Sequence, residues 1–328
     1  MKVGITYDLR EDYINDGYNS EELAEFDKIE TIDGIDEALK KLGFETVRIG
    51  NIKSLVKRLS ENERWDIVFN IAEGMHGLAR EAQVPALLDA YQIPYTFSDS
   101  YMLNICLHKG TTKSLVRSFG VATPDYHVIE DETDINKVNL KYPLFVKPVG
   151  EGTGKGINAL SKVNNFEELE FVSKKLLQDF KQPLLVEKYL CGREFTVGLV
   201  GTGEDAKVVG GMEIIINKNA EENGYTYFNK ENYEGLVSYE KIEGKLAKEC
   251  EELALKAWKC LNLRDGGRID IKLDENDVPN FLEVNPLAGL NPITSDLPIM
   301  CSMIGITYQE LINMIMQSAI KRLNYVTR

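Results

Sequence analysis

Two carboxylates, those of Asp270 and Glu283, are the side chains of this sequence best suited to hold a metal ion. They fall in two predicted strands, 267–274 and 280–285, which the polar turn 275–277 joins into a hairpin. Antiparallel pairing about this turn sets Asp270 directly opposite Glu283. Opposed like charges destabilise a hairpin, whereas a cation between them removes the repulsion, and Mg²⁺ prefers oxygen ligands. The alternative is a surface hairpin whose acids are merely solvated.

The same register adds a guanidinium and an amide to that face, because Arg268 falls opposite Asn285. On the reverse face the expected apolar pairs are Ile269 with Val284 and Ile271 with Leu282. The loop after the hairpin contains Gly289, whose backbone N–H could stabilise an oxyanion beside the metal. Ordinary turn chemistry would explain this glycine equally well.

A glycine-rich loop, GEGTGKG at residues 150–156, follows Lys147 and a predicted strand. Glycines allow backbone N–H groups to close around phosphate oxygens, and lysine supplies a compact positive charge. The loop is not a Walker A motif, because the GK[ST] order is absent and a strand, predicted at 157–161, follows it in place of a helix. A flexible β-turn of similar composition is the alternative.

Two further stretches could contact a nucleotide. The extended segment 186–190 (VEKYL) offers backbone groups and a carboxylate to an adenine edge, with Glu194 reaching ribose hydroxyls; an ordinary strand end is the alternative. Lys109 stands at the start of a predicted helix, where a cation is mildly unfavourable against the helix dipole. That position suggests a role beyond solubility, although a surface lysine would look the same.

The elements that must position these groups fall into three regions. Strands at 2–7, 46–49, 66–70 and around Tyr95 alternate with helices at 21–42, 52–59 and 80–90, while 8–22 is expected to be a loop. This alternation predicts a parallel α/β layer. A second region is expected to hold helices 109–119 and 166–179 and strands 144–149, 157–161 and 184–189. The third comprises strands 194–200 and 207–216, an active-site loop in 217–240, helix 245–261, the hairpin and helix 307–321.

Composition excludes several classes of protein. The 328 residues, 43% of them hydrophobic, can bury two or three cores. No run of eighteen apolar residues occurs and the chain begins in a predicted strand, so we expect neither a membrane span nor a signal peptide. The five cysteines lack CxxC spacing and the three histidines do not cluster, which argues against disulfides and zinc and for a cytoplasmic location. The net charge of −14 argues against nucleic-acid binding.

Taken together, Lys109, Lys147, the loop 150–156 and the hairpin acids stand in an order and spacing that resembles the ATP-grasp enzymes. Within that superfamily the chain looks most like the D-alanine–D-alanine ligases. The stretches that carry the resemblance are IPYTFSDS (93–100), KGTTKSLVRSFGVATP (109–124), FVKPVGEGTGKG (145–156), VEKYLCGREFTV (186–197) and GGRIDIKLDENDVPNFLEVNP (266–286).

The resemblance implies an α/β fold, α+β in part, in which two α+β subdomains clamp ATP. The implied domains are an N-terminal Rossmann-like domain (1–107), a central ATP-grasp subdomain with the phosphate loop (108–186) and a C-terminal subdomain with the metal site (187–328). It further implies a homodimer that acts on small amino-acid substrates in peptidoglycan precursor synthesis.

The resemblance also assigns roles on the nucleotide side. Lys109 and Lys147 would contact the phosphates of ATP. The residues that would close over the phosphates or hold adenine and ribose are Glu151, Gly152, Thr153, Gly154, Glu187, Lys188, Tyr189, Leu190, Glu194 and, in the mobile loop, Lys230. Two Mg²⁺ ions, for which Mn²⁺ could substitute, would be held by Asp270, Glu283 and Asn285. Glu283 would thereby contact the nucleotide as well.

For the reaction itself, Arg268 and the Gly289 N–H would stabilise the tetrahedral intermediate. Glu25 resembles the glutamate that binds the ammonium of the first substrate. Thr153 takes part in that network, and the loop with Ser295 and Asp296 would receive the second substrate.

Four departures from the family concern the amino-acid substrates. Residues 7–20 replace a histidine–glycine-rich start before the glutamate. Thr153-Gly154 replaces a serine pair. Lys230-Glu231, with Tyr233 after it, replaces Lys-Tyr. The loop Thr294-Ser295-Asp296-Leu297 is one residue longer, and its acid could repel a carboxylate or receive an amine.

The resemblance therefore predicts an ATP-dependent carboxylate–amine ligase that forms an acyl phosphate and then an amide. D-alanine and other amino-acid-like molecules remain open as substrates. A non-catalytic ATP-binding protein is the third alternative.

Overall fold

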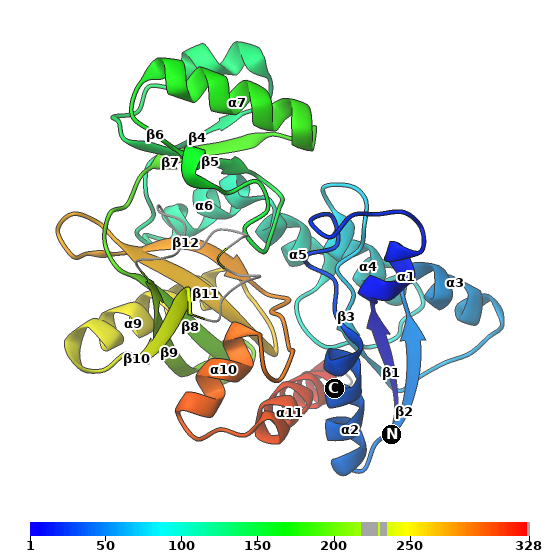
Figure 1. Cartoon of the computed structure of the whole chain (residues 1–328). Helices are drawn as coiled ribbons and strands as arrows, with labels where there is room; N and C mark the ends of the chain where they lie inside the picture. Colours follow the sequence, from blue (N-terminus) through cyan, green and yellow to red (C-terminus); the bar gives the residue numbers. More distant parts are fainter. Residues whose placement is uncertain (218–228, 230–234, 327–328) are drawn as a thin grey trace.

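Three β-sheets organise the computed structural model of the chain, which describes residues 1–217, 229 and 235–326 (Figure 1). The first sheet is parallel, with the order β2-β1-β3. Its strands are β1 (Lys2–Tyr7), β2 (Glu45–Gly50) and β3 (Ile67–Ile71). The parallel layer predicted from the alternation of strands and helices is therefore confirmed.

Alternate residues of β3 face opposite sides of this sheet, as the pleat requires. Phe69 and Ile71 pack against α2 (Ile29–Lys41), whereas Val68 packs against α3 (Ile52–Ser60) and α4 (Gln83–Ala90). All five residues of β3 are buried, so the sheet is covered on both faces.

The second sheet is antiparallel, with the order β4-β7-β5-β6. Its strands are β4 (Tyr126–Ile129), β5 (Leu144–Pro148), β6 (Lys162–Val163) and β7 (Leu184–Lys188). Helices α5 (Ser100–Leu107) and α6 (Lys109–Ser118) lead into it, and α7 (Phe166–Phe180) covers one face through Leu169, Val172 and Leu176.

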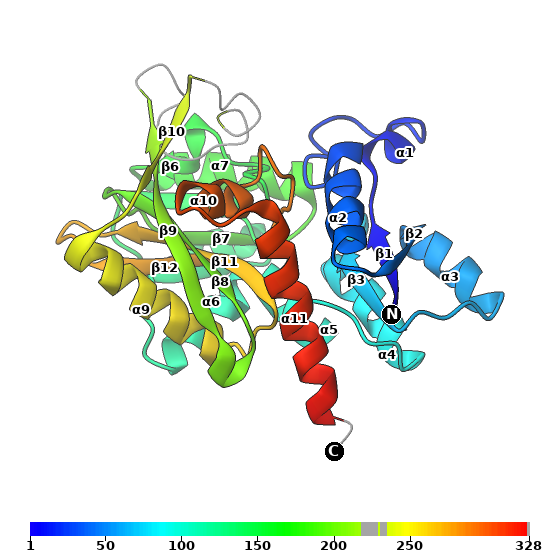
Figure 2. The ribbon, with the colours of Figure 1, turned by 90° about the horizontal axis from the view of Figure 1, so that it is seen from below.

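The third sheet, also antiparallel, has the order β10-β9-β8-β11-β12. Its strands are β8 (Glu194–Val200), β9 (Lys207–Ile216), β10 (Val237–Lys241), β11 (Gly266–Leu273) and β12 (Pro279–Asn285). Helix α9 (Gly244–Cys260) packs on one face, and α10 (Asp296–Met303) and α11 (Tyr308–Val326) pack on the other. Helix α11 lies between this sheet and α2, so the cores of the first and last regions are continuous (Figure 2).

The hairpin register is confirmed where the predicted site lies. Asp270 pairs with Glu283, Arg268 with Asn285 and Ile269 with Val284. The predicted pairing of Ile271 with Leu282 is wrong, because a β-bulge after Asp270 pairs Ile271 with Phe281 and leaves Leu282 as the extra residue. The bulge buries Phe281 in the core and turns Leu282 toward the same cavity as Glu283.

The predicted helix 21–42 is wrong at its start, because α2 begins only at Ile29. Asp27 is extended instead and pairs with the chain that leaves β1: its N–H donates to the Asp8 carbonyl at 3.1 Å, and the Arg10 N–H donates to the Asp27 carbonyl at 2.9 Å. Glu25 therefore lies in a turn and not on a helix.

Three further differences lie near the site. The segment 8–22 contains a short helix, α1 (Arg10–Ile14), where a loop was expected. The strand expected at 157–161 is wrong: Asn158 caps a 3-10 helix at Ala159–Ser161, and only Lys162–Val163 pair as a strand. Helices α5 and α10 and strand β4 were not predicted. Strand β10 was not predicted either, because it falls at the end of the segment 217–240 that was expected to be an active-site loop; residues 218–228 and 230–234 of that segment lie outside the described residues.

Within the part of the chain that the structure describes, no single helix has the length and apolarity to cross a membrane; one pair, 296–303 with 308–323, reaches them together but is bent by 114°.

Candidate active site

Glu187, on β7, lies between two buried lysines. Its carboxylate is 2.9 Å from Lys113 Nζ, on α6, and 3.0 Å from Lys147 Nζ, on the neighbouring strand β5. Burial raises the pKa of Glu187, but the two ammonium groups outweigh burial and hold it below its usual value. Burial lowers the pKa of Lys113 to about 8, against the opposing effect of Glu187. The three side chains form a buried cluster whose charges compensate one another.

Glu283, on β12, connects this cluster to the glycine-rich loop. Its Oε2 lies 3.7 Å from Lys109 Nζ and 3.8 Å from Lys147 Nζ. Lys109 Nζ also donates to the Glu151 carbonyl at 2.5 Å. The structure thus brings together the two lysines, the loop and the hairpin acid that the sequence predicts for one site.

A cavity of about 80 Å³, here called the nucleotide cavity, lies beside this cluster. Its predicted members are Lys147, Gly154, Glu187, Lys188, Tyr189, Leu190, Glu194, Asp270 and Glu283, and its unpredicted members are Phe145, Ile157, Lys272 and Leu282. Lys272 Nζ lies 2.8 Å from Glu194 Oε2, whereas Lys188 Nζ pairs with Glu275 at the hairpin turn at 2.6 Å. Glu194 therefore has a cationic partner within the cavity, and the Lys188 ammonium is held by the hairpin.

The predicted metal ligands meet at one end of the hairpin. Asp270 accepts hydrogen bonds from Arg268 Nη1 at 2.5 Å, Thr196 Oγ1 at 2.7 Å and Asn285 Nδ2 at 3.2 Å. Asn285 uses its amide nitrogen in that bond, so its side-chain oxygen is not consumed by it. Two facing carboxylates and an amide oxygen form an oxygen donor set that suits Mg²⁺. The described residues contain no cluster of three or more His, Cys, Asp and Glu side chains suited to a metal, so an ion here would need the amide as well.

Glu25 is already surrounded by donors from the chain itself. Arg80 Nη2 donates to both carboxylate oxygens at 2.9 and 2.8 Å, Lys155 Nζ donates at 3.0 Å and the Gly152 N–H at 2.5 Å. Burial raises the pKa of Glu25, but these neighbours outweigh burial and hold it below its usual value. The predicted ammonium ligand is thereby neutralised by two cations of the protein.

The same cations fix the glycine-rich loop against the first domain. Arg80 Nη1 donates to the Gly150 carbonyl at 2.6 Å, and Lys155 Nζ lies 2.5 Å from Glu151 Oε2. Thr153 adopts a left-handed backbone with φ of 53°. The loop is thus built around Glu25, which reaches it from 127 residues away.

Two further cavities share Glu25, Thr153, Arg268 and Gly289 in their walls. The first, of about 120 Å³, extends toward Lys109, Glu283 and Asn285 and is called the donor cavity below. The second, of about 220 Å³, contains Ser295 and Asp296 and is called the acceptor cavity.

Asp296 begins α10, and its Oδ2 lies 3.5 Å from Arg268 Nη1. A Cβ on Gly289 would lie 2.8 Å from Ser295 Oγ, so only glycine allows this close approach. Burial raises the pKa of Asp27, which also lines the acceptor cavity, to about 7. Of the predicted site residues, Lys230 and the neighbouring Glu231 and Tyr233 lie outside the described residues.

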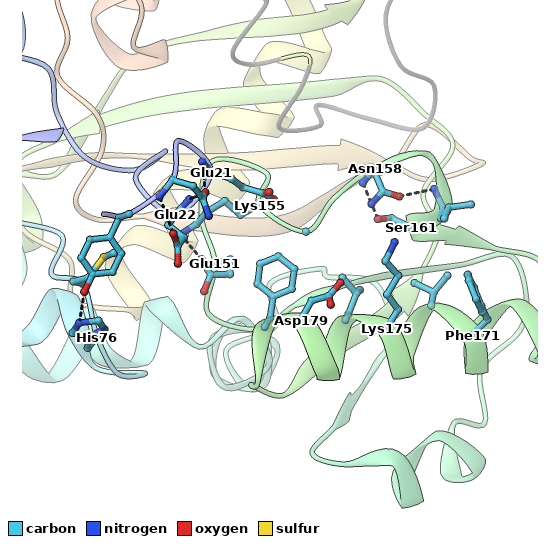
Figure 3. A pocket seen from close by; sticks show the side chains of 18 residues that line it. Glu21, Glu22, His76, Glu151, Lys155, Asn158, Ser161, Phe171, Lys175 and Asp179 are labelled. Atoms are coloured by element: carbon cyan, nitrogen blue, oxygen red, sulfur yellow. Dashed lines mark hydrogen bonds and ion pairs between the residues drawn. The ribbon is translucent and has the colours of Figure 1, made fainter. Parts of the chain in front are cut away.

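A cavity of about 560 Å³ lies on the outer side of the glycine-rich loop (Figure 3). Lys175 and Asp179 of α7 form one wall, and Glu151 and Lys155 of the loop belong to another. Apart from Glu151, Lys155 and Gly156 of the predicted phosphate loop, it contains none of the predicted site residues.

The predictions missed Lys113, Lys272, Arg80, Glu73 and Glu81, which all line a cavity or pair with a residue that does. One signal was present for Lys113, because it lies four residues after Lys109 and so on the same helix face. Arg80 and the two glutamates carry no local pattern, since distant segments bring them to the site.

Comparison with known proteins identifies relatives of the whole chain. The family model "D-ala D-ala ligase C-terminus" matches residues 115–317. A D-alanine–D-alanine ligase of Aquifex aeolicus is 34% identical over 289 residues, which cover 88% of this chain and 94% of that protein. A D-alanine–D-alanine ligase of Thermotoga maritima is 30% identical and covers 87% of this chain and 90% of that protein.

Solved structures have the same fold. The D-alanine–D-alanine ligase of Bacillus anthracis, complexed with ATP, superimposes with a TM-score of 0.73 at 22% identity and covers 98% of both chains. The VanG D-Ala:D-Ser ligase of Enterococcus faecalis gives 0.74 at 19% identity and covers 97% of this chain and 99% of that one. These likenesses confirm the predicted fold class.

Proposed function

The chain belongs to the D-alanine–D-alanine ligase family, and we propose that it joins two molecules of D-alanine in a reaction that converts ATP to ADP and phosphate. The observation that carries this proposal is a row of three cavities. Glu283 lines both the nucleotide and the donor cavity, and Arg268 lines both the donor and the acceptor cavity. One nucleotide and two small substrates can therefore meet at two shared side chains.

The nucleotide cavity would take the adenine and ribose of ATP, which would lie against Glu187–Leu190 and Glu194. Lys109 and Lys147 would contact the phosphates, and the loop 150–156 would close over them. Support comes from the two ammonium groups, which both lie within 4 Å of Glu283 at the border of the donor cavity. Fixed cations at that border oppose the negative charge of a transferring phosphoryl group.

Asp270, Glu283 and Asn285 would hold Mg²⁺, as two ions, with Mn²⁺ as a possible substitute. When bound, the metal would neutralise phosphate charge during the transfer. The oxygen donor set described above supports this assignment.

In the first step, a carboxylate oxygen of the donor D-alanine attacks the γ-phosphorus of ATP and the bond to ADP breaks, which leaves an acyl phosphate. In the second step, the amine of the acceptor D-alanine loses a proton and attacks the acyl carbon. Arg268 and the Gly289 N–H, which border both cavities, would stabilise the oxyanion that forms. Phosphate then leaves and the amide remains.

The proposal extends to three features that rest on the family resemblance: the domain boundaries at 107 and 186, a homodimer and a cytoplasmic location. The buried lysines and the hairpin acids, taken with the cavity row, favour catalysis over an ATP-binding role alone.

The function is tested by incubating the protein with ATP, Mg²⁺ and either D-alanine or L-alanine. We expect phosphate release with D-alanine in parallel with a dipeptide of two alanines detected by mass spectrometry. Phosphate release that requires a different pair of amino acids would show that D-alanine is not the substrate. Nucleotide binding without release for any pair would reject the ligase.

A further inference from the structure

Two glutamates in the donor cavity have no role in the mechanism above. Glu81, in the 3-10 helix Arg80–Ala82, is buried and only 9% exposed, whereas Glu73, which follows β3, is half-buried. Both line the donor cavity. Neither carboxylate makes a hydrogen bond or an ion pair with any other residue that the structure describes, although Arg80 and Lys109 lie close enough to act on Glu81 electrostatically. Glu81 is thus about nine-tenths buried, lines the cavity and has no partner in the described part of the chain, which favours a cationic ligand at this position.

The fold holds these two acids together. Gly74 has a φ of +71°, and a Cβ at this position would lie 2.5 Å from the Arg80 carbonyl. The Gly74 N–H also donates to Asp8 Oδ2 at 2.8 Å. The close approach that glycine permits brings the segment with Glu73 against the turn that carries Glu81.

Glu25, in the same cavity wall, is the contrasting case. One negative charge on Glu25 meets two positive ones, from Arg80 and Lys155, together with the Gly152 N–H. An incoming ammonium group would be repelled by these cations and would find the carboxylate oxygens occupied.

We propose that Glu73 and Glu81 bind the ammonium group of the donor amino acid in place of Glu25. This inference rests on the proposed function, because it uses the donor cavity of that reaction. The donor carboxylate would lie toward Lys109 and Glu283, and its ammonium, two bonds from the carboxyl carbon, toward the two acids. An ammonium offers three hydrogen-bond donors, which suits two carboxylates.

The electrostatics agree with this arrangement. Burial raises the pKa of Glu81 to about 7, and burial together with the charges of Glu81 and Glu25 raises the pKa of Glu73. A bound cation would lower the pKa values of both glutamates part of the way back toward their usual range.

The test compares a donor that has the ammonium with one that lacks it. Hydroxylamine traps the acyl phosphate as a hydroxamate, so kcat/KM is measured for D-alanine and for propionate with the wild type and with Glu73→Gln and Glu81→Gln. We expect each variant to reduce the preference for D-alanine over propionate by about 10-fold or more, because a charge-assisted bond is lost. The KM for ATP should remain within about two-fold. The matched control is Glu61→Gln, an exposed acid outside all three cavities, which should change neither quantity.

The outcomes separate this proposal from the proposed function. An unchanged preference in both variants would overturn the ammonium site while the ligase stands. A change in Mg²⁺ dependence without a change in preference would assign these acids to a cation site and would also overturn it. If another amino acid replaces D-alanine in the wild type, the D-alanine assignment fails, and that amino acid and its deaminated analogue decide the ammonium site by the same ratio. Hydroxamate from no amino acid would reject both.

Discussion

The acids on the two sides of the hairpin differ in whether a cation of the chain pairs with them. In the nucleotide cavity, Glu187 has two lysines within 3.0 Å and Glu194 has Lys272. In the donor cavity, Glu73 and Glu81 have no such partner among the described residues. The chain itself therefore pairs the acids of the nucleotide side, whereas on the donor side it pairs Glu25 but leaves Glu73 and Glu81 for a substrate to balance. This difference locates substrate preference in the donor and acceptor cavities, where Thr153 and the loop with Thr294, Ser295 and Asp296, from two of the four departures, also lie.

The largest effect is expected at the residue that both sides share. Glu283→Gln should lower kcat by about 10³-fold, because the side chain borders the phosphates, the metal and the donor at once. Folding should be retained, since Glu283 lies outside the apolar cores and glutamine preserves its shape. Steady-state rates and thermal denaturation check both parts. A variant with near wild-type turnover would remove Glu283 from the metal and phosphate roles.

Lys113→Met should disrupt the charge pairing around Glu187 on the nucleotide side. Lys113 is fully buried, and its loss leaves Glu187 with only one of two cations, so unfolding should become easier by about 3 kcal/mol. Urea denaturation measures this change. Lys53→Met, an exposed lysine on α3, is the matched control and should change stability by less than about 0.5 kcal/mol. A Lys113→Met variant as stable as its control would show that the buried pair is not needed.

The same substitution should have opposite effects on the two sides. Burial raises the pKa of Glu81 to about 7 from an unfolded value near 4.5, so the folded state binds the extra proton and stability falls as the pH rises between these values. Glu81→Gln removes this pH-dependent loss of stability, because glutamine does not titrate. At pH 8 it should stabilise the substrate-free protein by about 3 kcal/mol, and below pH 4.5 the difference should vanish.

Glu187→Gln is the counterpart on the nucleotide side and should destabilise at pH 8, because Lys113 and Lys147 would lose their shared carboxylate. Urea denaturation at pH 8 and at pH 5 measures both variants. If Glu81→Gln also destabilised the protein at pH 8, the two sides would not differ in the way described.

The smallest effect is expected in the acceptor cavity. Asp296→Asn removes a charge 3.5 Å from Arg268 without changing the shape of the side chain. It should shift the ratio of kcat/KM between acceptor amino acids by a few-fold, below about 1 kcal/mol, and leave the KM for ATP unchanged. Competition between two acceptors in one reaction gives the ratio directly. An unchanged ratio would place Asp296 off the acceptor path.

The nucleotide side could be predicted from sequence because its residues lie in short contiguous motifs. A strand followed by a glycine-rich loop, or two strands with alternating residues, carries its geometry locally, and the pairing of Asp270 with Glu283 followed from a turn and a period of two. The same rule failed one residue later, because the bulge that exposes Leu282 breaks that period without leaving a sequence signal.

On the donor side, Arg80, Glu73 and Glu81 could not be predicted, because tertiary contacts between distant segments bring them there. Arg80 reaches Glu25 across 55 residues, and Lys155 reaches it across 130. Glu25 itself was identified by resemblance. The pairing of its carboxylate with Arg80 and Lys155 could not be predicted, because no periodic sequence pattern relates these three residues. For the same reason Glu73, outside the predicted elements, and Glu81, within the predicted helix 80–90, gave no sign of a site before the fold placed them in a cavity.

In the proposed reaction, the row of cavities couples ATP cleavage to amide formation through an acyl phosphate. This coupling is tested most directly by supplying D-alanine labelled with ¹⁸O in its carboxyl group and analysing the released phosphate by mass spectrometry. Attack of the donor carboxylate on the γ-phosphorus transfers one carboxyl oxygen to the phosphate, so we expect one ¹⁸O in each phosphate released. Phosphate without label, released at the rate of turnover, would contradict it.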